Sequence, residues 1–162
     1  MQAQRAIRKL AGYVPKVSFT VVLIAFFLPF VLIKCDDKEI ARVKGTELIT
    51  GTSINYEDPF SEKNQQRKVA PNVYAIVLFA IAFIALIVSF LPITIKHFIL
   101  FFASFLGLID FVLLYNSIQE ELALEFDIEF LTGFYIIPVA LLFNFIFFIV
   151  AFASQAISPK NS

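Results

Sequence analysis

The sequence contains no tryptophan, only one cysteine and only one histidine among its 162 residues. The single Cys35 cannot form a disulfide within the chain, and a zinc site built from cysteine and histidine is excluded within one chain. No sign of charge dominates, because 13 Lys and Arg balance 13 Asp and Glu. Nothing in this balance indicates a nucleic-acid partner. Phosphate loops and nucleophile–base motifs are also missing, so we expect no enzyme activity, no cofactor and no metal.

Apolar residues are abundant instead. They make up 59% of the chain, with 21 phenylalanines, whereas a soluble domain has about 45–50%. Four runs approach the ~20 apolar residues that a spanning helix needs: 13–33, 73–95, 98–115 and 134–154. The second and third run must turn back at 92–97, since one continuous helix would measure about 60 Å. The sequence predicts a single membrane domain over 1–162, an all-α bundle of four transmembrane helices.

Four spans place the loops 34–72 and 116–133 on one side and both termini on the other. A raw count of cations does not decide the side. The flank of the first run, however, carries four cations and no acid, which favours cytoplasmic termini. The inverted orientation stays open. We interpret the first run as a retained helix, because no small-residue cleavage pattern ends it.

The outer loops carry strand patterns. Residues 122–130 alternate strictly between apolar and mostly acidic side chains, which is typical of a half-buried strand. Residues 40–43 and 47–50 flank Gly45 and predict a hairpin whose second strand ends at Gly51. Residues 53–68 are polar and predict a loose loop. Together they predict a small extracytoplasmic β-sheet that caps the bundle, with its last strand from the second loop.

These motifs carry a resemblance. The chain resembles small, uncharacterised bacterial four-helix membrane proteins, in which a Phe-Leu-Pro helix end precedes a single cysteine, a short hairpin and a Thr-Gly turn. The matching residues are Phe27, Leu28, Pro29, Cys35, Gly45, Thr50, Gly51, Gly133 and Phe134. The resemblance implies a multi-pass protein of the bacterial cytoplasmic membrane and brings no activity with it. The topology is also similar to that of claudin-like proteins, by analogy of architecture only, because their loop tryptophan and cysteine pair are missing here.

Two polar residues lie inside predicted spans. Asp110 shares a helical face with Ala103 and Gly107, so we expect it to face the bundle. A carboxylate at this depth indicates either proton or cation binding or a hydrogen-bonded packing residue. Asn144 lies near the middle of the last span, with Ala140 on the same face, and predicts a hydrogen bond between helices. From the helical rise, the depths of Asp110 and Asn144 differ by roughly 7 Å.

Four further residues are candidate contacts on the outer surface. Cys35 follows the first span and is either a structural thiol or a link to another chain. The carboxylates Glu125, Asp127 and Glu129 either attract cations or a basic partner, or form a solvated strand edge.

Two hypotheses of function follow. The first is a non-catalytic membrane module, an accessory or partner-binding subunit whose partners are the lipid bilayer and other membrane subunits or copies of itself. The alternative is a small ion- or proton-coupled carrier that uses Asp110 and Asn144.

Overall fold

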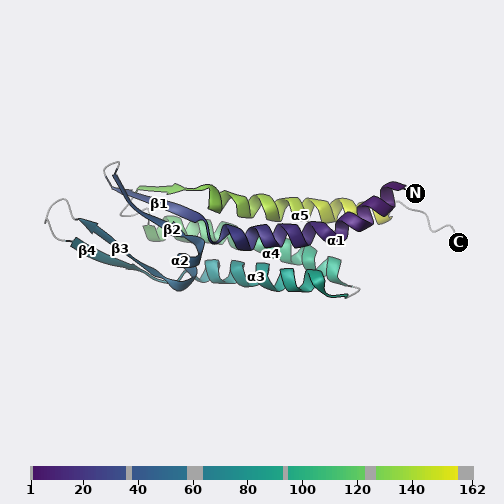
Figure 1. Ribbon diagram of the computed structural model, residues 1–162, viewed down its shortest axis with the longest axis horizontal. Coiled ribbons are helices and arrows are strands. Elements are labelled where there is room, and N and C mark those ends of the chain that lie inside the picture. Colours follow the sequence, from purple (N-terminus) through teal and green to yellow (C-terminus); the bar gives the residue numbers. More distant parts are fainter. Residues whose placement is uncertain (1, 36–37, 58–63, 93–94, 123–126, 157–162) are drawn as a thin grey trace.

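The computed structural model describes residues 2–35, 38–57, 64–92, 95–122 and 127–156. These residues form five helices and five strands, which follow one another along the chain as α1 (Gln2–Ala25), β1 (Pro29–Cys35), β2 (Lys38–Lys44), α2 (Gly45–Thr50), β3 (Thr52–Glu57), β4 (Asn64–Val69), α3 (Val73–Phe90), α4 (Lys96–Leu122), β5 (Asp127–Phe130) and α5 (Thr132–Ala156). The long helices lie side by side, and all strands extend from one end of them (Figure 1).

The four long helices form a ring in which each touches two neighbours. Helix α1 packs against α3 and α5, and α4 packs against the same two. Three helices are long and apolar enough to cross a membrane: Val73–Phe90, Lys96–Leu122 and Thr132–Ala153. The apolar part of α1, Gly12–Ala25, is shorter. The start of α1 and the end of α5 lie at the end of the bundle opposite the strands. The end of α3 and the start of α4 lie at the same end (Figure 1).

The first predicted span, 13–33, was wrong in its extent, because α1 ends at Ala25. A proline inside a helix clashes with the carbonyl four residues earlier, and for Pro29 that carbonyl belongs to Ala25. The chain tightens there through bonds from the Phe27 amide to the Ile24 carbonyl (3.0 Å) and from the Leu28 amide to the Ala25 carbonyl (2.9 Å). The rest of the predicted span becomes β1.

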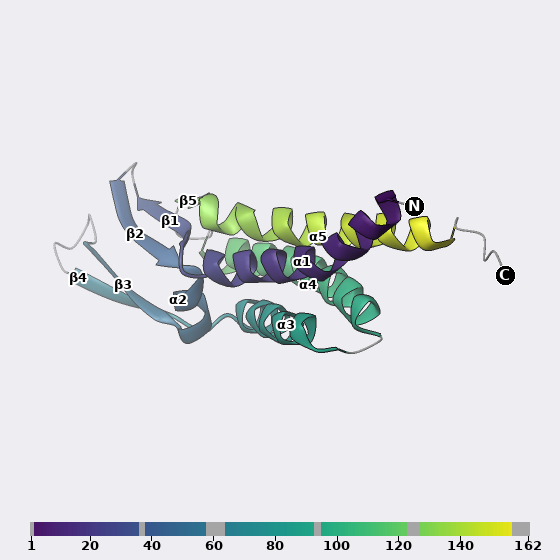
Figure 2. The ribbon, with the colours of Figure 1, turned by 45° about the vertical axis from the view of Figure 1, so that its right-hand side comes forward.

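The sheet that caps the bundle has three antiparallel strands in the order β2-β1-β5. Strand β1 follows α1 along the chain, and β5 comes just before α5. The two helices pack against each other, and the two strands next to them pair with each other (Figure 2). Val31 pairs with Phe130 and Lys34 with Asp127. A sheet joining the two outer loops was predicted correctly, but its central strand was missed.

The predicted hairpin around Gly45 was half wrong. Residues 40–43 are part of β2, whereas 47–50 belong to helix α2. The Glu47 carboxylate accepts a bond from the Lys44 amide at 2.8 Å, which is the return half of a capping box and starts a helix. Gly51 ends this helix rather than a strand; its φ of 78° lies in the left-handed region that favours glycine.

The predicted loose loop over 53–68 was also wrong where it is described. Strands β3 and β4 form an antiparallel hairpin from the pair Thr52–Val69 to the pair Glu57–Asn64. Two apolar residues near its base, Ile54 and Val69, are buried in the core. The polar segment is therefore a strand pair whose base is fixed by burial.

The strand predicted over 122–130 is confirmed only for β5. Leu122 is the last residue of α4, and residues 123–126 lie outside the described part of the chain. Helix α4 continues past the predicted end at 115 because Leu114, Ile118 and Leu122 repeat at helical spacing and are all buried. The predicted alternation holds within β5, where Asp127 and Glu129 are exposed. Ile128 and Phe130 are half-buried.

The remaining helices follow the predicted runs closely. Helix α3 ends before Pro92, and α4 returns from Lys96, which confirms the predicted turn. Helix α5 covers the fourth run. A face of small residues on α3 is buried; it consists of Ala75, Ala82, Ala85 and Ser89.

Candidate functional site

Two sets of residues are candidates for function: the polar side chains inside the bundle and the surface of the cap. Both are positioned by an aromatic junction, defined as Phe26, Phe30, Phe79, Phe111, Phe130 and Phe134. Phe26 directly follows α1, and the other rings come from β1, α3, α4, β5 and α5. Phe134 lies at its centre, with ring centroids 4.4 Å from Phe130, 4.6 Å from Phe111 and 5.8 Å from Phe30.

Two glycines allow the chain to close around the junction. A Cβ atom on Gly133 would lie 2.7 Å from the Pro29 carbonyl oxygen and 2.8 Å from the Leu28 Cβ. A Cβ atom on Gly45 would lie 2.6 Å from the Phe30 ring. Leu28, Pro29 and Gly133 thus meet at one place, between α1 and β1, and Gly45 contacts the Phe30 ring beside them.

Asn72 fixes the other side of the cap to the bundle. Its side-chain oxygen caps α3 by accepting from the amides of Tyr74 (3.0 Å) and Ala75 (3.3 Å). Its side-chain amide donates to the Ser117 hydroxyl of α4 at 2.8 Å. The Asn72 backbone amide donates to the Leu48 carbonyl of α2 at 2.7 Å. Sequence reasoning missed Asn72, although an asparagine directly before a long apolar run signals a helix N-cap.

Asn144 makes the predicted bond between helices, to a partner that the sequence analysis did not identify. Its side-chain amide donates to the Ser104 hydroxyl of α4 at 2.7 Å, and this hydroxyl donates to the Leu100 carbonyl at 2.9 Å. Both side chains are completely buried. The side-chain oxygen of Asn144 has no hydrogen-bond partner among the described residues.

Asp110 faces the bundle, as predicted. It is 7% exposed and lies on the buried face of α4 with Ser104 and Gly107, whereas Ala103 is only half-buried. Its Oδ2 atom is buried and has no hydrogen-bond partner in the described part of the chain. Asn144 bonds to Ser104, which is six residues, or about 9 Å along the helix, from Asp110. No described contact joins the two candidate residues.

The level of α4 between them is occupied by aliphatic side chains. A Cβ atom on Gly107 would meet Leu141 of α5 at 3.1 Å and Leu78 of α3 at 3.7 Å. Close helix approach at a small residue is the usual packing in membranes. Asp110 and Asn144 are therefore two separate polar positions with aliphatic side chains between them.

The cap surface presents charged side chains on its strands. Glu129 forms an ion pair of 2.6 Å with Lys34 of the neighbouring strand, and Asp127 is exposed beside it. On β2, Arg42 donates to the Glu39 carboxylate, and this bond lowers the pKa of Glu39. Glu125 lies outside the described residues.

Cys35 is the last residue of β1, paired with Lys38. The surroundings of its side chain lie outside the described part of the structure, so the two predicted roles, a structural thiol or a link to another chain, stay predictions. The groups of three or more His, Cys, Asp or Glu side chains that hold metal ions do not occur among the described residues.

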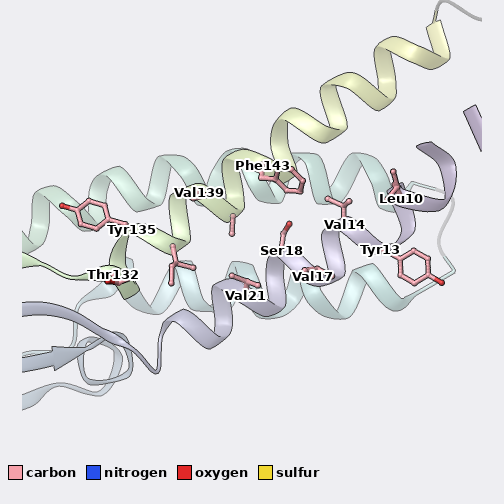
Figure 3. Close-up of a pocket in the computed structure, with 12 residues that line it drawn as sticks. Leu10, Tyr13, Val14, Val17, Ser18, Val21, Thr132, Tyr135, Val139 and Phe143 are labelled. Atoms are coloured by element: carbon pink, nitrogen blue, oxygen red, sulfur yellow. The ribbon is translucent and has the colours of Figure 1, made fainter. Parts of the chain in front are cut away.

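A shallow apolar groove runs along the outer face of α1 and α5 and encloses about 690 Å³ (Figure 3). Exposed valines and Phe143 line it, together with the buried Ser18 and the half-buried Ala140. Tyr13 and Tyr135 mark opposite ends of the groove. Tyrosines with an apolar body and a polar tip are enriched where a bilayer meets water.

No protein-family model matches this chain, and no significant match was found among curated proteins or among solved structures.

Proposed function

We propose that this chain is a non-catalytic integral membrane module, an accessory or partner-binding subunit of a bacterial cytoplasmic membrane assembly. Its four long helices cross the bilayer, both termini are cytoplasmic, and the cap is the docking surface outside. The observation that carries this proposal is the fixed attachment of the cap. Only residues 26–28 separate α1 from β1, and only Leu131 separates β5 from α5. The aromatic junction takes rings from that turn, from β1, from β5 and from α5.

The short first helix is compatible with four spans. Gly12–Ala25 covers about 21 Å at helical rise, which is less than the ~30 Å of hydrocarbon. The apolar start of β1 extends this path, and its residues Phe30, Val31 and Ile33 are fully buried by protein. Non-helical backbone is tolerated at membrane depth when it is buried in protein. Strand pairing on both sides satisfies the backbone of β1.

The edge strand β5 is the proposed contact with the partner. An edge strand offers unpaired backbone groups to another chain, and β5 presents the exposed carboxylates Asp127 and Glu129. These carboxylates favour a partner with basic side chains, because opposite charges steer and orient association.

The carrier hypothesis ranks second. The observation that supports it is the buried Oδ2 atom of Asp110, which has no hydrogen-bond partner among the described residues. Two contacts weigh against it: Asn144 donates to Ser104, and Leu141 fills the level between the two polar residues. A relay would have to cross that aliphatic level.

Photo-crosslinking in intact membranes tests the docking surface. A photoreactive amino acid at Asp127 should give a defined crosslinked product, and the same probe at Ser53, exposed on β3 of the same cap, should not. Adding Glu129→Gln to the Asp127 probe should weaken crosslinking by removing the remaining carboxylate. Equal crosslinking at both sites, or at neither, would refute docking through β5.

Cysteine labelling tests the topology separately. In a Cys35→Ser background, single cysteines replacing Ala3, Asn64, Glu121 or Lys160 should react with an impermeant reagent from outside only at 64 and 121. Labelling at 3 and 160 alone would invert the protein.

A further inference from the structure

We propose that Asp110 is a proton-binding site inside the bundle, where its carboxyl group holds a proton at neutral pH and acts as a hydrogen-bond donor. This inference is independent of partner docking at the cap. It concerns one side chain, at a position where an ionised carboxylate would have neither hydrogen-bond donors nor cations close to it.

The first argument is the lack of hydrogen-bond donors. An ionised carboxylate accepts hydrogen bonds with both oxygens and donates none. The buried Oδ2 of Asp110 receives no bond from the described residues. Ser104, a buried polar side chain on the same face of α4, already donates its hydroxyl hydrogen to the Leu100 carbonyl.

The second argument is the lack of nearby cations. Helices α3 and α5, which pack against α4, contain no Lys, Arg, His, Asp or Glu, and their titratable side chains are tyrosines. On α4 itself, Lys96 and His97 begin the helix, about 20 Å from Asp110 along its axis. On α1, the ammonium of Lys16 lies 4.6 Å from the centre of the Phe90 ring, at the same end as Lys96.

The third argument is the energy of the ion. Placing an unpaired carboxylate in an apolar interior is so unfavourable that such groups take up a proton and become neutral instead. Proton uptake removes the charge and turns one oxygen into a donor. A donor on a helical side chain can reach the carbonyl one turn back, as Ser104 does toward Leu100. For Asp110 the corresponding carbonyl belongs to Leu106.

The position also leaves a route for the proton. Ser117 of α4 bonds to the N-cap of α3 and marks the cap end of the helix pair. Asp110 is seven residues, or about 10 Å, from that level. Exchange with water at the cap end therefore requires a shorter path than exchange at the other end.

Infrared spectroscopy of the purified protein, reconstituted in phosphatidylcholine vesicles, tests the proposal. The wild type should show the C=O stretching band of a protonated carboxylic acid at about pH 7, where ordinary aspartates are ionised. Asp110→Asn should lose this band, and Glu129→Gln on the cap should retain it. A wild type without the band at that pH, or a band unchanged in Asp110→Asn, would overturn the proposal.

Chemical labelling of the wild type gives an answer even if Asp110→Asn does not fold. Dicyclohexylcarbodiimide enters apolar regions and reacts with protonated carboxyl groups, which transfer the proton to its nitrogen as the carboxyl oxygen adds to its central carbon. Mass spectrometry should locate the adduct on Asp110 at neutral pH and should find less of it as the pH rises. Absence of the adduct, with normal elution of the protein, would contradict a neutral acid.

Discussion

The bundle and the aromatic junction close their interiors in different ways. In the bundle, small residues such as Ala82, Ala85 and Gly107 bring helices together, and many large side chains are exposed on the outer face. At the junction, six phenylalanines, three buried and three half-buried, pack together, and two glycines make room for the backbone around them. Lipid chains are as apolar as leucine, so helices in a membrane gain from close contact rather than from burial. The junction lies at the cap end of the bundle, and there the burial of large rings stabilises the fold.

The largest expected effect is that of a single methyl group at the junction. In Gly133→Ala the new Cβ would lie 2.7 Å from a backbone oxygen, so β1 or α5 must shift. We expect a loss of about 3 kcal/mol in the free energy of unfolding, the upper part of the range for overpacked sites. Denaturation in mixed micelles measures this loss.

Gly12→Ala is the matched control for that experiment. It lies in α1 with nothing within 4 Å of the added Cβ, and alanine is the better helix former by about 0.5–1 kcal/mol. Its stability should stay equal or rise. Equal effects of both substitutions would show that the junction is not tightly closed.

A middle-sized effect is expected for the polar contact within the bundle. Asn144→Leu and Ser104→Ala each remove one partner of the buried bond. The two together should show a coupling energy of about 1 kcal/mol, because hydrogen bonds between membrane helices average about 0.6 kcal/mol with values up to ~1.7. A double-mutant cycle measures it, and strictly additive effects would mean that the bond contributes nothing.

The smallest effect is expected for Gly107→Ala. Its Cβ would approach only the end of the Leu141 side chain at 3.1 Å, and that side chain can move by the few tenths of an ångström required. The gain in helix propensity offsets the displacement. The free energy of unfolding should change by less than about 1 kcal/mol. A loss as large as that of Gly133→Ala would remove the distinction between bundle and junction.

The sequence predicts the bundle better than the cap, for a physical reason. Three apolar runs became α3, α4 and α5, because length and polarity alone indicate helices in lipid. The first run failed at Pro29, whose effect reaches back to Ala25, and the segment after it is too short and apolar for periodicity to separate strand from helix. Likewise Gly45 was interpreted as a hairpin turn, whereas the contact of Glu47 with the Lys44 amide makes it the start of a helix.

The candidate site was predicted in part. The inward direction of Asp110 followed from the small residues on its face, and the bond of Asn144 to another helix followed from its depth. Its partner Ser104 could not be chosen from the sequence, since that requires the relative rotation of α4 and α5. The role of Asn72 required contacts among three elements that are distant in the chain.

The order of the strands has a consequence for how the protein is made. The centre of the sheet, β1, is synthesised early and pairs on one side with β2, its neighbour in the chain. Its other side pairs with β5, and the ion pair between Lys34 and Glu129 joins residues 95 positions apart. Strand β5 is followed at once by α5, so it reaches its place together with that helix. The edge of the cap formed by β5 therefore exists only on chains in which α5 has joined the bundle, and the proposed partner at this edge would select such chains.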